Sequence, residues 1–508
     1  MIRPADIFTD RAVLQQRMPI PVWGECDTER LVISYAGNSV TAEVADGKFF
    51  GVLPPVQAGV RGKLVFCAGE ETCTCHDVAV GEVWVAGGQS NMEHPLFCTR
   101  YDPSVLTEDE DLRFFTVPRR TQPGVERWGW HFEGLRAVDT PWTVCTAESA
   151  LHFSAIAYAF GRRLRQRLHV PVGIISCNWG GTVIETWISE KYLSLDPLTR
   201  RFGEEWNRRL AGQDMASYLA HEQAVQEELG AYIAERGDTA AEAARNGADV
   251  FLRTPNPTVW PSEGPYHPNA PSILRREMVG RITPYAIRGV LWHQGESNAR
   301  RADEDSRDWY LRLLHALAAD WREAFRNPEL PFYLVQISTY DGGAGSGENW
   351  CRVREAQERF AEEDENAYMT VSVDLGEPDN IHPARKWEMG ERLAAAALDR
   401  TYGIPTPWEG PKLLSAVREE KGFTLRFDHP LGLCDGALEA GDFFYRLADG
   451  KRIPAPAHLQ EGDVVLSLPP DAEQVTGIGY VLANYSRATL VCRETGLPLA
   501  PFTCRLRS

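Results

Sequence analysis

The protein has 508 residues, which exceeds one compact core and suggests about three domains of ordinary size. Hydrophobic residues make up 43% and charged residues 24% of the chain, a balance typical of folded proteins. The net charge of −18 disfavours partners such as nucleic acid or an anionic membrane, because both bind to concentrated positive side chains.

The sequence shows neither a signal peptide nor a membrane span. Arg3, Pro4 and Asp6 precede any apolar run, and no stretch approaches the roughly 18 apolar residues of a spanning helix. We therefore expect a cytoplasmic protein, or a secreted one if a leader was removed. The 11 cysteines are scattered and odd in number, which favours reduced thiols. Cys73 and Cys75 are interpreted as alternate residues of a strand instead of zinc ligands.

Residues 1–80 contain short apolar stretches separated by Gly, Asp and Asn turn signals. Examples are residues 20–23, 31–35 and 63–66. Short strands with frequent turns are typical of antiparallel sheets. We predict an N-terminal β-sandwich domain over this range.

Residues 81–404 alternate between apolar runs and segments with helical periodicity. Near-continuous apolar runs indicate parallel strands buried on both faces, and the alternation indicates helices on both sides of the sheet. We predict a three-layer α/β/α core with a parallel sheet. The predicted strands are Val83–Ala86, Val172–Ser176, Gly289–Trp292, Phe332–Val335 and Met369–Val373. The predicted helices are Ala155–Leu168, Trp309–Phe325, Val353–Ala361 and Trp387–Leu398.

An insertion over about residues 193–276 interrupts this alternation. It has charged, helix-favouring segments at Glu222–Glu235 and Thr239–Arg245, then a proline-rich stretch over Pro255–Pro271. We interpret it as a frame for the active site. If the protein forms a homo-oligomer, this insertion is where we expect the second subunit. Residues 405–508 return to short strands, which predicts a C-terminal β-domain.

Ser90 lies at the carboxyl end of the first predicted strand of the core, in the segment Gly87-Gly88-Gln89-Ser90-Asn91-Met92. Open α/β sheets bind ligands at this edge, and the two glycines allow a tight turn that exposes the Ser90 hydroxyl. The alternative is a plain glycine-rich turn in which Ser90 caps a helix. The segment does not match the G-x-S-x-G nucleophile elbow.

A serine nucleophile needs a base, and the base needs a carboxylate to orient it. Asp379 and His382 supply both, three residues apart after the last predicted strand. Asp374 is the competing carboxylate for His382, and His293 is the competing imidazole. We interpret His293 as a packed residue inside or just beyond a strand instead of a catalytic one. The predicted catalytic triad is therefore Ser90, His382 and Asp379.

Two further loops follow strands of the same predicted sheet. Ester cleavage forms a negative oxygen that needs preorganised hydrogen-bond donors. Residues 178–182 include Gly180 and Gly181, which can offer a backbone N–H, and residues 293–298 include Gln294 and Asn298, which can offer a side-chain amide. With the Ser90 N–H, these groups are the candidate oxyanion donors. The candidate substrate-binding residues are Asn91, His293, Glu296 and Asn298.

Taken together, these segments resemble the sialate O-acetylesterase family of SGNH hydrolases. The matching runs cover nearly the whole chain apart from the insertion. They are Gly88-Gln89-Ser90-Asn91-Met92-Glu93, Trp179-Gly180-Gly181-Thr182, Gln294-Gly295-Glu296-Ser297-Asn298, Arg354-Glu355-Ala356-Gln357 and Ile381-His382-Pro383.

The resemblance implies an SGNH (flavodoxin-like) hydrolase core flanked by β-domains. It implies metal-independent removal of acetyl groups from sialic acids or plant polysaccharides, with no cofactor. The family's roles fall on Ser90 as nucleophile, His382 as base and Asp379 as its orienter. The oxyanion donors become the Ser90 amide, Gly180 or Gly181, and Gln294. Residues 272–278 depart from the family's sequence, and His293 stands where the family frequently has tyrosine. Both departures weaken the assignment of sialic acid as the substrate more than the assignment of ester chemistry.

Loops set the substrate specificity of such a fold. The sequence therefore leaves two substrate classes open, O-acetylated sialic acid and acetylated oligosaccharides from xylan, mannan or xyloglucan. The acetyl position and the oligomeric state stay open as well. One rival is a non-catalytic carbohydrate-binding protein on an inactive hydrolase scaffold, which an intact Ser, His and Asp set disfavours. A second rival is a peptidase or lipase, although the charged insertion does not look like an apolar lid.

Overall fold

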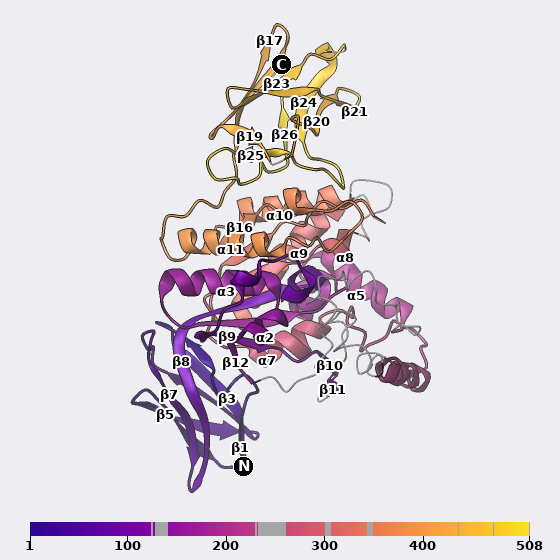
Figure 1. Ribbon diagram of the computed structural model, residues 1–508. Coiled ribbons are helices and arrows are strands. Elements are labelled where there is room, and N and C mark those ends of the chain that lie inside the picture. Colours follow the sequence, from indigo (N-terminus) through magenta and orange to yellow (C-terminus); the bar gives the residue numbers. More distant parts are fainter. Residues whose placement is uncertain are drawn as a thin grey trace.

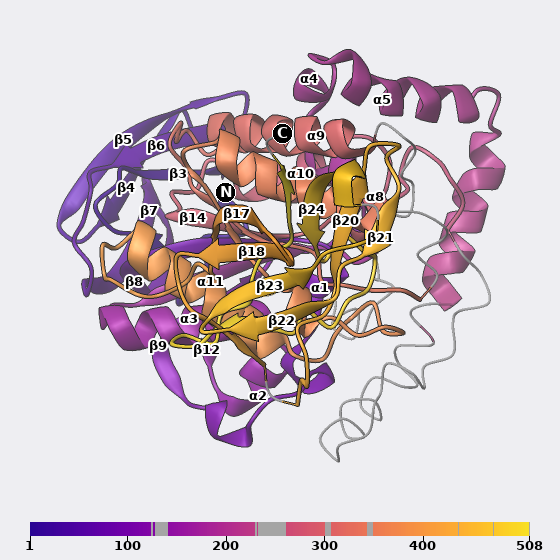
Figure 2. The same cartoon turned by 90° about the horizontal axis from the view of Figure 1, so that it is seen from above.

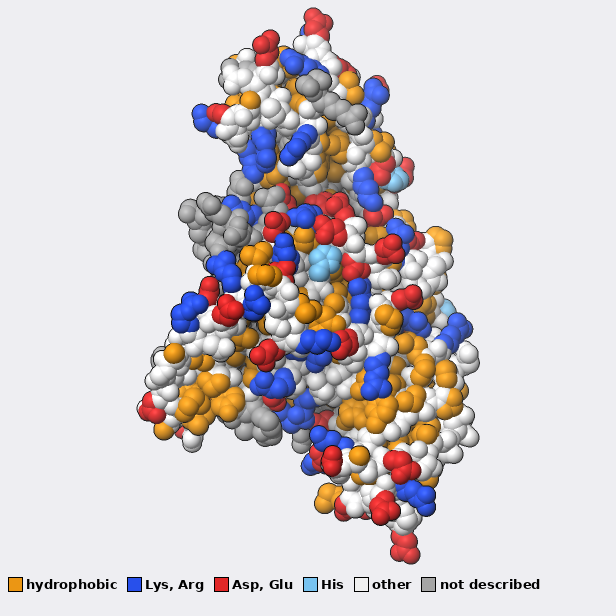
Figure 3. Space-filling model, turned by 180° about the vertical axis from the view of Figure 1, so that it is seen from behind, with side chains coloured by type: hydrophobic (Ala, Val, Ile, Leu, Met, Phe, Trp, Pro, Cys, Tyr) orange, Lys and Arg blue, Asp and Glu red, His pale blue; other side chains and the backbone are white. Residues whose placement is uncertain are grey.

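A computed structural model describes residues 1–122, 125–126, 141–228, 231, 261–299, 306–342, 349–434, 436–470 and 472–506. The N-terminal strands, a large sheet with its helices and the C-terminal strands follow one another along the molecule (Figure 1). No helix among these residues is long and apolar enough to cross a membrane. On the face shown in Figure 3, acidic and basic side chains are interspersed.

The first part of the chain folds into short antiparallel strands, as its turn signals predict. In β4 and β6, buried side chains alternate with exposed or partly exposed ones, because successive residues of a strand point to opposite faces. The strands are β1 (Ile2–Pro4), β2 (Val13–Gln15), β3 (Ile20–Cys26), β4 (Arg30–Tyr35), β5 (Asn38–Ala45), β6 (Lys48–Leu53), β7 (Arg61–Ala68) and β8 (Glu71–Gly88).

Strand β8 joins the N-terminal strands to the large sheet. Its first half pairs antiparallel with β7, and its second half pairs parallel with two core strands. The chain passes close to its neighbour here, since a Cβ on Gly81 would lie 1.9 Å from the Pro171 carbonyl oxygen. Cys73 and Cys75 both lie in this strand. The predicted domain boundary near residue 80 thus falls inside one continuous strand.

The core of the large sheet is parallel. The strand order is β12-β9-β13-β8-β14-β15-β16, and only the β12–β9 pair in this run is antiparallel. The strands added here are β9 (Asp109–Thr116), β12 (Thr143–Cys145), β13 (Val172–Asn178), β14 (Gly289–His293), β15 (Phe332–Val335) and β16 (Ala367–Thr370). A mixed α/β fold with a large sheet, as predicted, is confirmed.

Two details of the predicted strands are wrong. Strand β9 was not predicted, because its first three residues, Asp109, Glu110 and Asp111, are acidic and shorten the apolar run. The predicted strand Met369–Val373 ends earlier, at Thr370, and Val373–Leu375 forms a 3-10 turn instead. This early end brings the chain to the sheet edge sooner and lengthens the loop that carries His382.

Helices cover both faces of the sheet. Val83 and Val85 of β8 belong to the same buried cluster as residues of α9 and α10, whereas Trp84 and Ala86 share a cluster with α3 and α11. Alternate side chains of this strand therefore pack into two separate cores, one on each face of the sheet. The four helices are α3 (Ala155–Leu168), α9 (Ser306–Ala324), α10 (Asn349–Glu363) and α11 (Lys386–Arg400), close to the predicted ranges.

Shorter elements connect the core strands. Residues 215–228 of the predicted insertion are helical, whereas Thr239–Arg245 lies outside the described residues. Figure 2 shows α4 and α5 at the periphery, beside α9. The short elements are α1 (Ser90–Glu93), α2 (Ala147–Leu151), α4 (Glu190–Leu193), α5 (Pro197–Arg209), α7 (Gly280–Ile282), α8 (Glu296–Ala299), β10 (Arg120–Gln122) and β11 (Val125–Glu126).

The C-terminal strands form three small sheets around their own buried cluster. They are β17 (Leu413–Glu419), β18 (Gly422–Phe427), β19 (Leu431–Leu433), β20 (Phe443–Leu447), β21 (Arg452–Pro454), β22 (Ala457–Gln460), β23 (Asp463–Ser467), β24 (Val475–Tyr480), β25 (Leu490–Cys492) and β26 (Phe502–Arg505). The sandwich form of the two flanking regions and their domain boundaries stay predictions.

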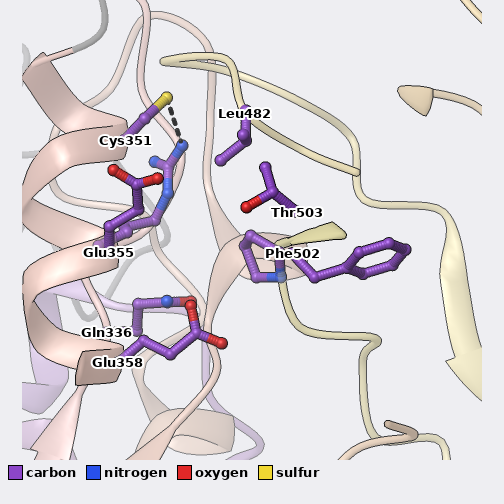
Figure 4. Close-up of a pocket in the computed structure, with 9 residues that line it drawn as sticks. Gln336, Cys351, Glu355, Glu358, Leu482, Phe502 and Thr503 are labelled. Carbon is purple, nitrogen blue, oxygen red and sulfur yellow. Dashed lines mark hydrogen bonds between the residues drawn. The ribbon is translucent and has the colours of Figure 1, made fainter. Parts of the chain in front are cut away.

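A small pocket lies where α10 meets the C-terminal strands. Cys351, Glu355 and Glu358 of α10 face Leu482 and Thr503 across it (Figure 4). The buried Arg354 guanidinium donates to the carbonyl oxygens of residues 483 and 484, which ties the helix to the loop after β24. These contacts fix the C-terminal strands to the core.

Glu358 in this pocket makes the stability of the protein depend on pH. Burial raises its pKa to about 8, with smaller contributions from Glu362 and Glu355. Between the unfolded pKa of about 4.3 and the folded pKa of about 8, the folded state keeps a proton that the unfolded state has lost, so the stability falls as the pH rises across this interval. We expect Glu358→Gln to raise the thermal unfolding midpoint at pH 8 and to change it little at pH 4.5.

The control for this measurement is Glu329→Gln, which removes an exposed carboxylate. Calorimetric unfolding of the two variants and the wild type at both pH values gives the comparison. Equal midpoint shifts for Glu358→Gln at pH 8 and pH 4.5 would contradict the buried-carboxyl account.

Candidate active site

The turn after β8 is shaped for close approach of the backbone. Gly88 has a φ of +133°, and a Cβ there would lie 2.1 Å from the His293 carbonyl oxygen. The next residue, Gln89, donates its N–H to that same oxygen at 3.0 Å. Only glycine fits this position, and the result is that Ser90 begins a short helix at the carboxyl edge of the sheet.

Ser90 and His382 are in direct contact. The His382 Nε2 atom lies 2.8 Å from the Ser90 Oγ atom, although the two residues are 292 positions apart. Both are buried, with 4% and 7% of their surfaces exposed. The His94 ring stacks on the His382 ring with centroids 5.0 Å apart and an interplanar angle of 13°. A histidine at hydrogen-bond distance from a serine can remove its proton, which makes Ser90 a nucleophile.

No hydrogen bond joins His382 to either candidate carboxylate among the described residues. Asp379 is exposed, and no hydrogen bond or ion pair within 4.0 Å links it to His382 in this part of the chain. Asp374 accepts two hydrogen bonds from Arg392, at 2.7 and 2.6 Å, so each of its carboxylate oxygens already has a donor. The loop is held instead by Asn380, whose Oδ1 accepts the His382 N–H at 3.0 Å.

The predicted oxyanion donors differ in their present partners. The Gly180 N–H donates to the buried Glu93 carboxylate. The Gln294 Nε2 atom donates to Gln89 Oε1, the Thr182 carbonyl oxygen and Asn298 Oδ1, at 3.1, 3.2 and 2.7 Å. Gly181 has a φ of +75°, and a Cβ there would contact nothing within 4 Å. The Ser90 and Gly181 amides donate no hydrogen bond to any described residue.

The predicted substrate-binding residues are buried and fall into two hydrogen-bonded groups. Asn91 donates to Glu296 Oε1, which lies 3.5 Å from His293 Nε2. Burial lowers the pKa of His293, against the opposing effect of Glu296. Asn298 donates to the buried Glu185 at 3.0 Å. His293 lies in β14 and is fully buried, and no hydrogen bond joins it to Ser90 among the described residues.

The sequence reasoning missed two charged residues of this region, Glu93 and Lys386. Glu93 is 1% exposed, and it binds both the Gly180 N–H and the Arg119 guanidinium, the latter at 2.5 Å. Lys386 is fully buried and donates to Asn91 Oδ1. Lys386 could have been noticed, because a lysine at the first residue of a helix opposes the helix dipole and therefore suggests a specific partner.

Comparisons with known proteins show what this chain is similar to. Residues 266–399, which include Gln294 and His382, match the family model described as carbohydrate esterase, sialic acid-specific acetylesterase. This part of the chain is therefore similar to carbohydrate esterases, and Ser90 lies outside the matched range. The predicted resemblance to the sialate O-acetylesterase family is confirmed.

Individual relatives make the likeness more specific. The chain is 26% identical to the sialate O-acetylesterase of Rattus norvegicus over 473 residues, which is 86% of this chain and 79% of that protein. It is 26% identical to the Homo sapiens sialate O-acetylesterase over 366 residues, covering 67% of this chain and 57% of that protein. The solved structure of a carbohydrate acetylesterase from Xanthomonas citri superposes with a TM-score of 0.75, 26% identity and 99% coverage of both chains.

Proposed function

We propose that the protein is a carbohydrate O-acetylesterase that works through an acetyl-serine intermediate on Ser90. The observation that carries this proposal is the 2.8 Å contact between His382 Nε2 and Ser90 Oγ at the carboxyl edge of a parallel sheet. The family match and the likeness to sialate and carbohydrate acetylesterases support the acetyl ester as the bond that is cleaved.

In the proposed reaction, His382 takes the Ser90 proton while Oγ attacks the acetyl carbonyl carbon. The oxygen of the tetrahedral intermediate accepts hydrogen bonds from the Ser90 and Gly181 amides. Protonated His382 then gives its proton to the departing sugar hydroxyl, which leaves acetyl-Ser90. His382 next removes a proton from the water that attacks this ester and gives it to Ser90 Oγ as acetate leaves, which restores both residues.

We propose Asp379 as the carboxylate that orients His382 when substrate is bound. It is three residues before His382 on the same loop, and catalytic hydrogen bonds often tighten only in the substrate complex. The engagement of Asp374 by Arg392 supports this choice over the alternative. A contact between Asp379 and the His382 Nδ1–H would keep Nε2 free to accept the Ser90 proton.

The substrate class is tested with acetate release from three kinds of compound. These are 9-O-acetyl sialic acid, acetylated xylan and mannan oligosaccharides, and 4-nitrophenyl acetate. We expect turnover of at least one acetylated sugar by the wild type and its loss in Ser90→Ala, with full activity in Ser467→Ala, a control at the exposed end of β23. An inactive wild type, or an active Ser90→Ala, would favour the binding-protein alternative or another nucleophile.

A further inference from the structure

Lys386 is a buried lysine that the proposed reaction does not use. It is the first residue of α11 and 0% exposed. Burying an ammonium group and placing it at a helix N-terminus both cost free energy. We therefore expect a specific role for Lys386. Desolvation lowers the pKa of Lys386 to about 7, against the opposing effect of Glu296 and Glu377.

The side chain of Asn91 links Lys386 to both reacting residues. Its Oδ1 accepts from Lys386 Nζ at 2.5 Å. Its Nδ2 donates to the carbonyl oxygen of Ile381 at 3.1 Å, and also to Glu296 Oε1. Asn91 directly follows Ser90, and Ile381 directly precedes His382. One carboxamide therefore connects the backbone beside the nucleophile to the backbone beside the base.

The charges on either side fix the orientation of this carboxamide. When Lys386 is protonated, an ammonium faces its oxygen and a buried carboxylate faces its NH2 group, so a flipped amide would meet the wrong charge at both ends. Without Lys386, the Asn91 oxygen loses its donor. The amide could then rotate, and the bond from Nδ2 to the Ile381 carbonyl oxygen would no longer be held.

We propose that Lys386 is a positioning residue of the esterase reaction, which acts through Asn91 to hold the His382 loop against Ser90. This inference rests on the proposed function. Lys386 touches neither Ser90 Oγ nor His382 Nε2 among the described contacts. Its effect is on the geometry of the 2.8 Å pair and therefore on kcat, not on the affinity for the sugar.

The test uses Lys386→Met in two backgrounds. Lys386→Met alone leaves Glu296 buried without a compensating cation, which destabilises the fold. In Glu296→Gln that penalty is absent, so we expect the double variant to unfold at or above the temperature of Glu296→Gln. We expect its kcat to fall about 100-fold below that of Glu296→Gln, the scale of misplacing a reacting group by about 1 Å, with KM changed less than about twofold.

A second background tests the route through Asn91. In Asn91→Leu, adding Lys386→Met is expected to lower kcat by less than about twofold, since the link is already broken. The exposed Lys412→Met is the control and should leave kcat unchanged. A double variant of Lys386→Met and Glu296→Gln with the kcat of Glu296→Gln, or additive losses in Asn91→Leu, would overturn the positioning role.

A fluorophosphonate probe separates this inference from the proposed function. If the probe labels Ser90 and the unlabelled wild type releases acetate, the proposed function is satisfied. The kcat comparisons alone then decide the role of Lys386. Wild-type protein with neither labelling nor turnover would overturn both. In the double variant, we expect labelling to slow by about the same factor as kcat.

Discussion

His382→Gln is expected to lower kcat for acetate release by about 10⁴-fold or more, because loss of the base in a serine hydrolase removes most of the rate enhancement. The His382 Nε2 atom lies 2.8 Å from Ser90 Oγ and is the only proton acceptor that the described residues place there. Glutamine can still hydrogen-bond the hydroxyl, but it cannot accept its proton. KM is expected to change little, and steady-state kinetics measure both constants.

The control is His458→Gln, which removes an exposed histidine in β22. His94→Gln is a second comparison, since the His94 ring stacks on His382 without reaching Ser90 Oγ in the described contacts. We expect a much smaller effect on kcat from His94→Gln. A His382→Gln variant that retains a tenth or more of the wild-type rate would mean that another group serves as base.

Asp379→Asn is expected to lower kcat by about 10³-fold, because an asparagine cannot stabilise the imidazolium and favours the wrong tautomer of His382. Thermal stability should be unchanged, since Asp379 is exposed. Asp374→Asn should show the opposite pattern. It breaks the partly buried bidentate pair with Arg392 and costs about 3 kcal/mol of stability, with kcat lowered far less.

These two variants are matched in chemistry and differ only in position. Measuring kcat and the unfolding midpoint for both therefore separates the orienting role from a structural one. If Asp379→Asn keeps its activity while His382→Gln is inactive, Ser90 and His382 act as a pair without a carboxylate. If Asp374→Asn alone loses kcat at full stability, the alternative carboxylate is correct.

Local signals explain why parts of this fold can be predicted from the sequence. Helix α3 covers the predicted range Ala155–Leu168, because Ser154 caps its start and His169 ends it in the left-handed conformation. Strand β9 was missed, since its acidic start suppresses the apolar pattern on which the prediction depends. The loop of residues 178–182 was found from its place after a strand, which parallel topology brings to the same edge as Ser90.

The sequence was sufficient to predict those site residues whose role follows from their residue type and from their place after a strand. Ser90 and His382 were chosen on that ground, and the structure brings them together. Hydrogen-bond partners were not predictable, because they depend on packing across the sheet. Gln294 was expected to face the oxyanion, yet its amide donates to Gln89, Thr182 and Asn298. Lys386 was missed for the same reason, since only the fold places it beside Asn91.

The most direct test of the account is to trap the acyl-enzyme. The wild type is mixed with 4-nitrophenyl acetate, quenched with acid within the first turnover and analysed by peptide mass spectrometry. The account predicts one added acetyl group on the peptide that contains Ser90, and none in Ser90→Ala. Acetate turnover with an unmodified Ser90, or with the acetyl group on another residue, would contradict it.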